Sequence, residues 1–225
     1  MLDEGVEPNF VTIASVLPLC ARMKNLQHGK EFHCYMMKRG HQFNGHLLLW
    51  NSLVEMYSRS FQVLEARNVF DSLNRRDKIT YTAMILGYGM ISHGDTALKL
   101  FEEMPMFNIK PDNVTMVAVL MALGRSVAWD RSRFVKAGKF LFRMRTEVYE
   151  INPTVEHYSC MVHLFGMAGH LNKAKKVIME EMPCSPTSEM WATLIVACQI
   201  HRDRVMGKWA EGKLMQNMKL QQFSS

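Results

Sequence analysis

Residues 78–112 read KITYTAMILGYGMISHGDTALKLFEEMPMFNIKPD, and this stretch decides the fold because its pattern recurs along the chain. Tyr81 is followed three and four residues later by Met84 and Ile85, a spacing that places apolar side chains on one side of a helix. Ala97 belongs to a second apolar stripe, and a small residue there lets two helices approach closely. The stretch therefore predicts a helical hairpin.

The same residue types return at the same positions in residues 47–77 and 155–187. Counted from the first residue of each unit, position four holds Trp50 and Tyr158, and position 20 holds an alanine. A period of about 20 to 50 residues is typical of arrays in which each unit buries its apolar face against its neighbours. The sequence thus predicts an all-α fold, a right-handed superhelical solenoid of helix-turn-helix repeats.

Composition and charge exclude several other classes of protein. Lys and Arg exceed Asp and Glu by 27 to 21, which favours polyanionic partners. The apolar runs stop far short of the roughly 20 residues of a membrane-spanning helix, so no membrane association is expected. The five cysteines lack a C-x-x-C pair, which indicates reduced core residues in an intracellular compartment. The acidic N-terminus, MLDEGVEP, shows no targeting peptide.

No catalytic residue, metal site or cofactor is predicted. A zinc deaminase needs H-x-E and paired cysteines, and none of the nine histidines begins H-x-E. His157, Cys160 and His163 share a predicted helix but do not form one clean ligating face, so they are interpreted as structural. The segment GYG at residues 87–89 lacks the further residues of a phosphate-binding loop. The chain is therefore not expected to be an enzyme.

Two repeat families fit hairpins of this length, and the motifs distinguish them. The tetratricopeptide repeat is disfavoured because the A-x3-F element of residues 97–101 comes without L-G-x2-Y. The segments ITYTAMI (79–85), ALKLFEEM (97–104) and IKPD (109–112) resemble a plant pentatricopeptide repeat (PPR) of the 35-residue kind.

Other parts of the chain resemble further repeat types of that family. WNSLVEMY (50–57) with EARNVF (65–70) resembles its short repeat, and residues 155–201 resemble the closing short repeat and the extension motif of the PLS class. The chain is thus identified as a fragment or truncated member of that class. The repeats are placed as 1–9 (tail of a preceding repeat), 10–44 (long-type), 47–77 (short-type), 78–112 (standard), 113–154 (divergent long-type with an insertion), 155–187 (short-type) and 188–220 (partial extension repeat).

The resemblance implies a function as well as a fold. Members of the family bind single-stranded RNA with one base per repeat, in mitochondria or plastids. The chain is accordingly expected to be a monomeric specificity factor in organellar RNA processing or C-to-U editing, with editing or processing proteins as further partners. Two alternatives stay open: a helical scaffold that binds proteins along a concave surface, and a truncated relative without function.

The same resemblance assigns base reading to position five and to the last position of each repeat. Asn51 with Asp77 is expected to prefer uracil, and Thr82 with Asp112 to prefer guanine, which gives a 5′-U-G-3′ step. The competing interpretation is that Asn51 and Thr82 are merely polar residues of first helices. Further residues at base-reading positions are Ala14, Asn44 and Ser159. Residues at position two, expected to sandwich bases between neighbouring repeats, are Val11, Leu48, Ile79 and Val114.

Overall fold

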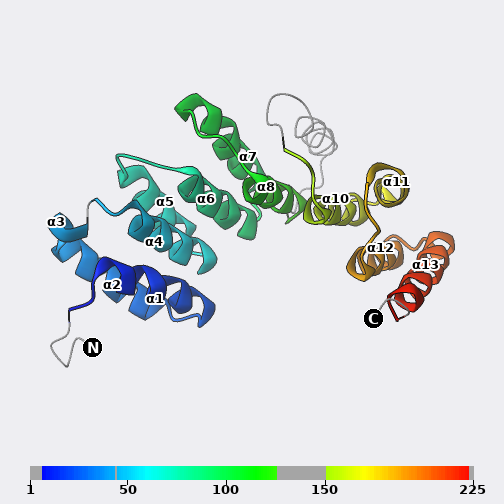
Figure 1. Ribbon diagram of the computed structural model, residues 1–225, viewed down its shortest axis with the longest axis horizontal. Helices are drawn as coiled ribbons and strands as arrows, with labels where there is room; N and C mark the ends of the chain where they lie inside the picture. Colours follow the sequence, from blue (N-terminus) through cyan, green and yellow to red (C-terminus); the bar gives the residue numbers. More distant parts are fainter. Residues whose placement is uncertain (1–6, 44, 126–150, 223–225) are drawn as a thin grey trace. The chain divides into compact units, whose positions relative to one another are not determined.

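A computed structural model of the protein describes residues 7–43, 45–125 and 151–222 (Figure 1). Regular secondary structure in these residues is entirely helical. The chain forms two compact units, Met1–Pro111 and Asp112–Ser225. None of the described helices is long and apolar enough to span a membrane.

The first unit is a stack of helical hairpins. Its first helices α1, α4 and α6 pack side by side, and the second helices α2, α5 and α7 each pack on the first helix of their own hairpin (Figure 1). Both flanks of α4 are therefore covered by neighbouring first helices. The helices of this unit are α1 (Phe10–Arg22), α2 (Leu26–Lys38), α3 (Gly40–Phe43), α4 (Leu47–Arg59), α5 (Val63–Ser72), α6 (Lys78–Met90), α7 (Gly94–Glu103) and the 3-10 segment η2 (Met104–Phe107).

Large side chains at position four anchor the first helices in the core. Ile13, Trp50 and Tyr81 are all at most 9% exposed. At position 20, Ala66 and Ala97 are completely buried, as close approach of two helices requires. Burying one large apolar side chain contributes about 1.5–3 kcal/mol. The apolar stripes read from the sequence thus form the core of the hairpins.

In every hairpin whose turn lies among the described residues, the turn has the same backbone conformation. One residue is left-handed, and the amide N–H of the next residue donates to a carbonyl oxygen in the last turn of the first helix, as His93 does to Tyr88 at 2.9 Å. Glycine adopts this conformation most readily, yet only one of these described turns has a glycine at the left-handed position. The left-handed residues, with φ between 55 and 78°, are Lys24, Phe61, Ser92, Gly169 and Arg202.

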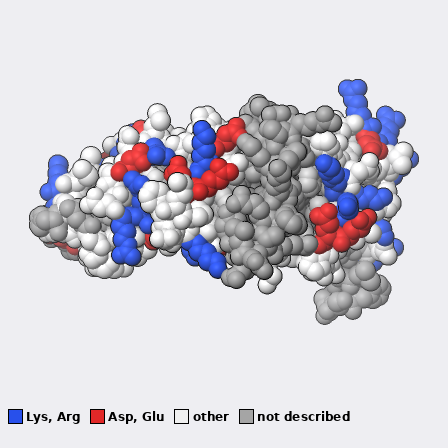
Figure 2. Space-filling view, turned by 90° about the horizontal axis from the view of Figure 1, so that it is seen from above, with Lys and Arg blue, Asp and Glu red and all other residues white. Residues whose placement is uncertain are grey.

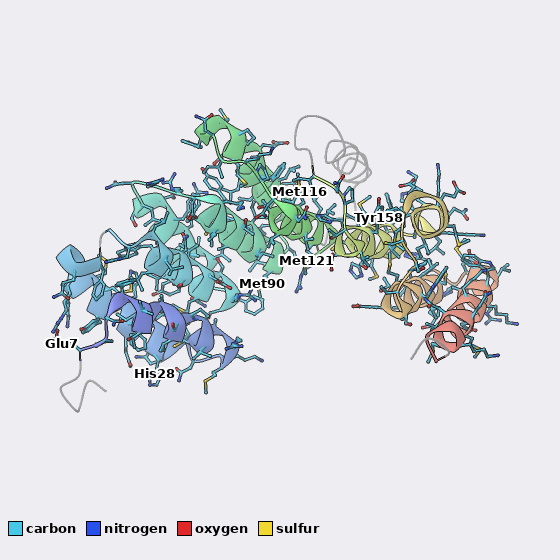
Figure 3. All side chains as sticks on the ribbon, viewed as in Figure 1. Glu7, His28, Met90, Met116, Met121 and Tyr158 are labelled. Carbon is cyan, nitrogen blue, oxygen red and sulfur yellow. The ribbon has the colours of Figure 1, made fainter. Side chains whose placement is uncertain are left out.

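The second unit repeats the arrangement around α10, which packs against α8 and α12. At position four Met116 and Tyr158, both labelled in Figure 3, are completely buried. Gly166 lets α10 and α12 approach, since a Cβ there would lie 2.9 Å from the Ala197 Cβ. The helices are α8 (Asn113–Arg125), α10 (Val155–Met167), α11 (Leu171–Lys176), the π-helical η3 (Val177–Glu181), α12 (Ser188–Ile200) and α13 (Arg204–Gln222).

Some features differ from the sequence-based expectations. Cys20 and Cys198 are buried, but Cys34 and Cys184 are exposed, so the prediction of core cysteines was wrong for these two. The divergent repeat placed at residues 113–154 begins with α8, and its residues 126–150 lie outside the described residues.

Candidate nucleic-acid interface

Asp77 is the last residue of the second predicted repeat and the N-cap of α6. Its carboxylate accepts a hydrogen bond from the Thr80 N–H at 2.9 Å, and its own N–H donates to Thr80 Oγ1 at 3.1 Å. These reciprocal bonds form a capping box, which satisfies donors that a helix terminus otherwise leaves without partners. A carboxylate here also interacts favourably with the helix dipole. Asp77 therefore has a structural role whatever else it does.

Asn51, on α4, lies against this cap. Its Nδ2 donates to both carboxylate oxygens of Asp77, at 3.0 and 3.1 Å, and its Oδ1 accepts from the Thr80 hydroxyl at 2.6 Å. Because a carboxylate accepts only from the nitrogen, the orientation of the amide follows from its partners. Asn51 is 3% exposed and Thr80 is completely buried. The cluster thus joins residues from two successive repeats.

Sequence reasoning paired Asn51 with Asp77 and missed Thr80. The signal for Thr80 was present as an N-terminal pattern, since D-x-x-T at residues 77–80 recurs at residues 112–115, with N-x-x-T at 9–12. In the last of these, the Thr12 N–H donates to Asn9 Oδ1 at 2.8 Å. The pattern predicts capping, but only the packing of α4 on α6 brings the hydroxyl to Asn51.

Arg76 fixes the loop that carries Asp77. Its Nε donates to the carbonyl oxygen of Phe70 at 2.8 Å, and its guanidinium lies 4.5 Å from the centre of the Phe70 ring. The Phe70 ring in turn packs edge-on against Tyr81, with centroids 5.1 Å apart. The path from α5 to α6 is therefore tied to the core on both sides of the cap.

The position-two residues form the apolar part of the candidate interface. Leu48 and Ile79, from adjacent helices, are half exposed, although aliphatic side chains of this size are usually buried. At the same position α10 and α12 carry exposed glutamates, Glu156 and Glu189. The apolar residues and their exposed fractions are Val11 52%, Leu48 58%, Ile79 51% and Val114 63%.

The junction between α1 and α4 lacks the polar cluster. Ala14 at position five is buried and carries no hydrogen-bonding side-chain group. The residue directly before α4 is His46, which makes no capping hydrogen bond and stacks on Phe10 with ring centroids 4.0 Å apart. Asn44, predicted to read a base here, lies outside the described residues.

The second predicted pair consists of Thr82 and Asp112. Thr82 is 8% exposed on α6, and Asp112 precedes α8, where its Oδ1 accepts from the Thr115 N–H at 3.0 Å. The two residues belong to different units, and their joint reading of a base stays a prediction.

Ser159, at position five of α10, lines a cavity of about 270 Å³ formed by α8, α10 and α12. Burial raises the pKa of the Cys160 thiol in this cavity to about 11, so the thiol stays protonated at neutral pH. Burial and the nearby Arg125 charge lower the pKa of His163. The cavity is lined by Leu120, Met121, Arg125, Ser159, Cys160, His163, Glu189, Met190 and Thr193.

His157 has the structural role expected from the sequence. Its Nδ1 accepts from the Thr154 N–H at 2.9 Å and its Nε2 lies 3.1 Å from the carbonyl oxygen of Asn113. Both ring nitrogens are thereby used, with the proton on Nε2. Among the residues that the structure describes, no group of histidine, cysteine and acidic side chains is arranged to hold a metal ion.

Basic residues recur at the end of the first helices. The last residue of α1, α4 and α8 is an arginine: Arg22, Arg59 and Arg125. Arg59 pairs with Glu55 at 2.7 Å. On the face shown in Figure 2, Lys and Arg side chains are interspersed with Asp and Glu, so their charge is not gathered in one basic patch there. Polyanion binding at this face would therefore depend on single side chains.

These features define a class of protein, an array of helical hairpins with a polar cluster and exposed aliphatic residues along its first helices. The sequence model of the PPR repeat family matches residues 76–125, and that of the PPR repeat matches residues 48–77 and 156–180. The chain belongs to the PPR family.

Proteins of Arabidopsis thaliana are among its relatives. Pentatricopeptide repeat-containing protein At1g22830 is 48% identical over 215 residues, which cover 96% of this chain and 29% of the relative. Pentatricopeptide repeat-containing protein At2g13600 is 36% identical over 217 residues, which cover 95% of this chain and 30% of the relative. The chain thus spans less than a third of the length of these relatives.

Solved structures confirm the predicted all-α repeat fold. The protein PPR10 in complex with an 18-nt psaJ RNA element matches with a TM-score of 0.63 and 17% identity, over 94% of this chain and 29% of PPR10. The PPR domain of Arabidopsis thaliana protein-only RNase P 1 in complex with tRNA matches with a TM-score of 0.57 and 17% identity, over 73% of this chain and 86% of that domain.

Proposed function

We propose that this chain binds single-stranded RNA and reads a uracil at the junction of α4 and α6. The observation that carries the proposal is the buried amide of Asn51, fixed between Asp77 and Thr80. Family membership supports it, as do the two solved complexes, in which proteins of the same fold hold RNA.

The Asn51 amide keeps hydrogen-bonding capacity that suits a base edge. An amide has two N–H donors and two acceptor lone pairs, and only part of each is used by Asp77 and Thr80. Uracil offers carbonyl acceptors beside an N–H donor, whereas cytosine offers the opposite polarity at two of these places. An amide of fixed orientation therefore discriminates between the two pyrimidines.

Leu48 and Ile79 supply the stacking surfaces in this proposal. Leu48 lies three residues before Asn51, so both side chains are on the same side of α4, and Ile79 is the second residue of the adjacent α6. Stacking of a base on an aromatic ring is worth about 1–3 kcal/mol, and these aliphatic side chains would supply apolar contact to the faces of the base instead. The glutamates at this position in α10 and α12 offer no such surface, and base sandwiching is therefore proposed for the apolar positions alone.

Arg22, Arg59 and Arg125 are proposed to contact phosphates. Each phosphate contact makes binding weaker as salt rises. Because only three arginines are proposed to contact phosphates, a shallow salt dependence is expected, with most discrimination coming from the bases. We extend the proposal to guanine at Thr82 and Asp112, and to a role as specificity factor in organellar RNA processing or editing.

The direct test measures dissociation constants of the 225-residue chain for single-stranded RNAs that carry U-G or U-U at one step. The wild type is expected to prefer U-G, and Thr82→Asn to shift preference toward U-U by about tenfold, since base discrimination is worth about 1–3 kcal/mol. Thr12→Asn is the matched control, because it makes the same change at position three of α1. The proposal fails if the chain binds neither RNA, or if Thr82→Asn does not change the ratio of the dissociation constants for the U-G and U-U RNAs.

A further inference from the structure

We propose that Thr80 is a positioning residue for base recognition, so that the reading of one base depends on three side chains from two successive repeats. Thr80 lies in the first turn of the third repeat, 78–112. Asn51, whose amide oxygen accepts a hydrogen bond from Thr80, belongs to the second repeat, 47–77. The inference rests on the proposed reading of uracil by Asn51.

The geometry separates the tasks of Asp77 and Thr80. Asp77 binds only the nitrogen end of the Asn51 amide, which fixes its polarity but leaves the amide free to pivot about that contact. The Thr80 hydroxyl binds the oxygen end at 2.6 Å, closer than its 2.9 Å approach to Asp77 Oδ1. Two fixed ends define the plane of the amide, and therefore the direction of the N–H and lone pair left for a base.

Burial makes this second contact consequential. Thr80 is completely buried and Asn51 nearly so, and hydrogen bonds are stronger where water does not compete. Without the hydroxyl, Asn51 Oδ1 would lose its buried donor and the amide would turn to find another. The preference for uracil over cytosine would then weaken, even with Asn51 and Asp77 unchanged.

The neighbouring junction supports this coupling between repeats. Between α1 and α4, position five is Ala14, and the residue at the place of Thr80 is Leu49, which is completely buried. At the α1–α4 junction, the apolar Leu49 thus accompanies the apolar Ala14. At the α4–α6 junction, the hydroxyl group of Thr80 accompanies the amide of Asn51. Capping alone does not require this correspondence, since Leu49 also lies in the first turn of its helix.

The test uses the full chain and two RNAs that differ only by U or C at the position assigned to Asn51. Thr80→Val, which keeps the shape and removes the hydroxyl, is expected to lower the U-to-C affinity ratio by about tenfold, the effect of one orienting hydrogen bond. Thr80→Ser, which restores the hydroxyl, is expected to keep the ratio within about twofold. Thr115→Val is the matched control, because Thr115 is equally buried and forms the equivalent capping bonds with Asp112.

A second measurement needs no RNA. The side-chain NH₂ signal of Asn51 in a nitrogen–proton correlation spectrum is expected to shift in Thr80→Val and to return in Thr80→Ser. If Thr80→Val loses helix content by circular dichroism, Thr80→Ala takes its place in both measurements.

The outcomes distinguish the two proposals. A wild-type chain that binds RNA without preferring U to C overturns the proposed reading by Asn51, and the positioning role falls with it. A wild-type preference that Thr80→Val leaves unchanged, with all RNAs weakened equally as in Thr115→Val, overturns the positioning role alone and leaves Thr80 as a capping residue.

Discussion

Two junctions of the first unit occupy the same place in the repeat and differ in chemistry. Between α4 and α6, a polar cluster of Asn51, Asp77 and Thr80 is closed by hydrogen bonds. Between α1 and α4, the corresponding residues are Ala14, His46 and Leu49, which offer no such bonds. The residues at position four are buried at both junctions: Ile13 of α1, Trp50 of α4 and Tyr81 of α6. The packing of first helices therefore does not depend on the polar cluster.

A cluster that the fold does not need still has an energetic effect where it is present. A buried polar group costs free energy unless its hydrogen bonds are made. Asn51 is thus tolerated in the core only together with Asp77 and Thr80, whereas Ala14 needs no partners. The α4–α6 junction should therefore be more sensitive to polar substitutions than the α1–α4 junction, and the predictions below begin with that contrast.

The largest expected effect comes from removing the cap of α6. Asp77→Ala removes an N-cap and leaves the Asn51 Nδ2 without its acceptor, and we expect a loss of about 2–4 kcal/mol in the free energy of unfolding. His46→Ala at the equivalent place loses only the stack on Phe10, a loss within about 1 kcal/mol. Urea unfolding followed by circular dichroism measures both. Equal losses would contradict the distinction between the junctions.

A smaller effect is expected where Gly87 of α6 lies against Ser58 of α4. A Cβ on Gly87 would lie 2.7 Å from Ser58 Oγ and 3.3 Å from the Ser58 Cα, so both a side chain and the backbone are in the way. Gly87→Ala should cost about 1–3 kcal/mol through overpacking. The matched control is Gly212→Ala in α13, where nothing lies within 4 Å and alanine should instead stabilise by about 0.5–1 kcal/mol. A gain in thermal stability for Gly87→Ala as well as for Gly212→Ala would show that α4 and α6 move apart freely.

Residues that recur with a period were predictable from the sequence, and contacts between repeats were not. Tyr81 and Ala97 were predictable as buried residues, because the spacing of apolar residues in a helix indicates which face is buried. The hydrogen bond from Thr80 to Asn51 spans 29 residues and depends on the register of two packed helices, which no local pattern encodes.

The smallest expected effect is a pH dependence of stability that arises from His157. It extends the comparison to the residues in the first turn of the first helices. His157 occupies in α10 the place of Thr80 in α6, and burial lowers its pKa, against the opposing effects of its hydrogen bond to Asn113 and of the Glu156 charge. Because the folded-state pKa lies below the unfolded value, the unfolded chain takes up the proton first as pH falls. Stability is therefore complete above about pH 6.5, the unperturbed histidine value, and decreases as pH falls through the folded-state pKa.

Protonation of Nδ1 would remove the acceptor of the Thr154 N–H, a loss of about 1 kcal/mol. His157→Gln keeps an acceptor at this position of the helix and cannot titrate, so its free energy of unfolding should fall less between pH 7 and pH 5 than that of the wild type. The comparison must be made against the wild type, because burial also lowers the pKa values of His33 and His163 and their contribution remains in both proteins. Parallel pH profiles for the two proteins would show that His157 does not couple the start of α10 to pH.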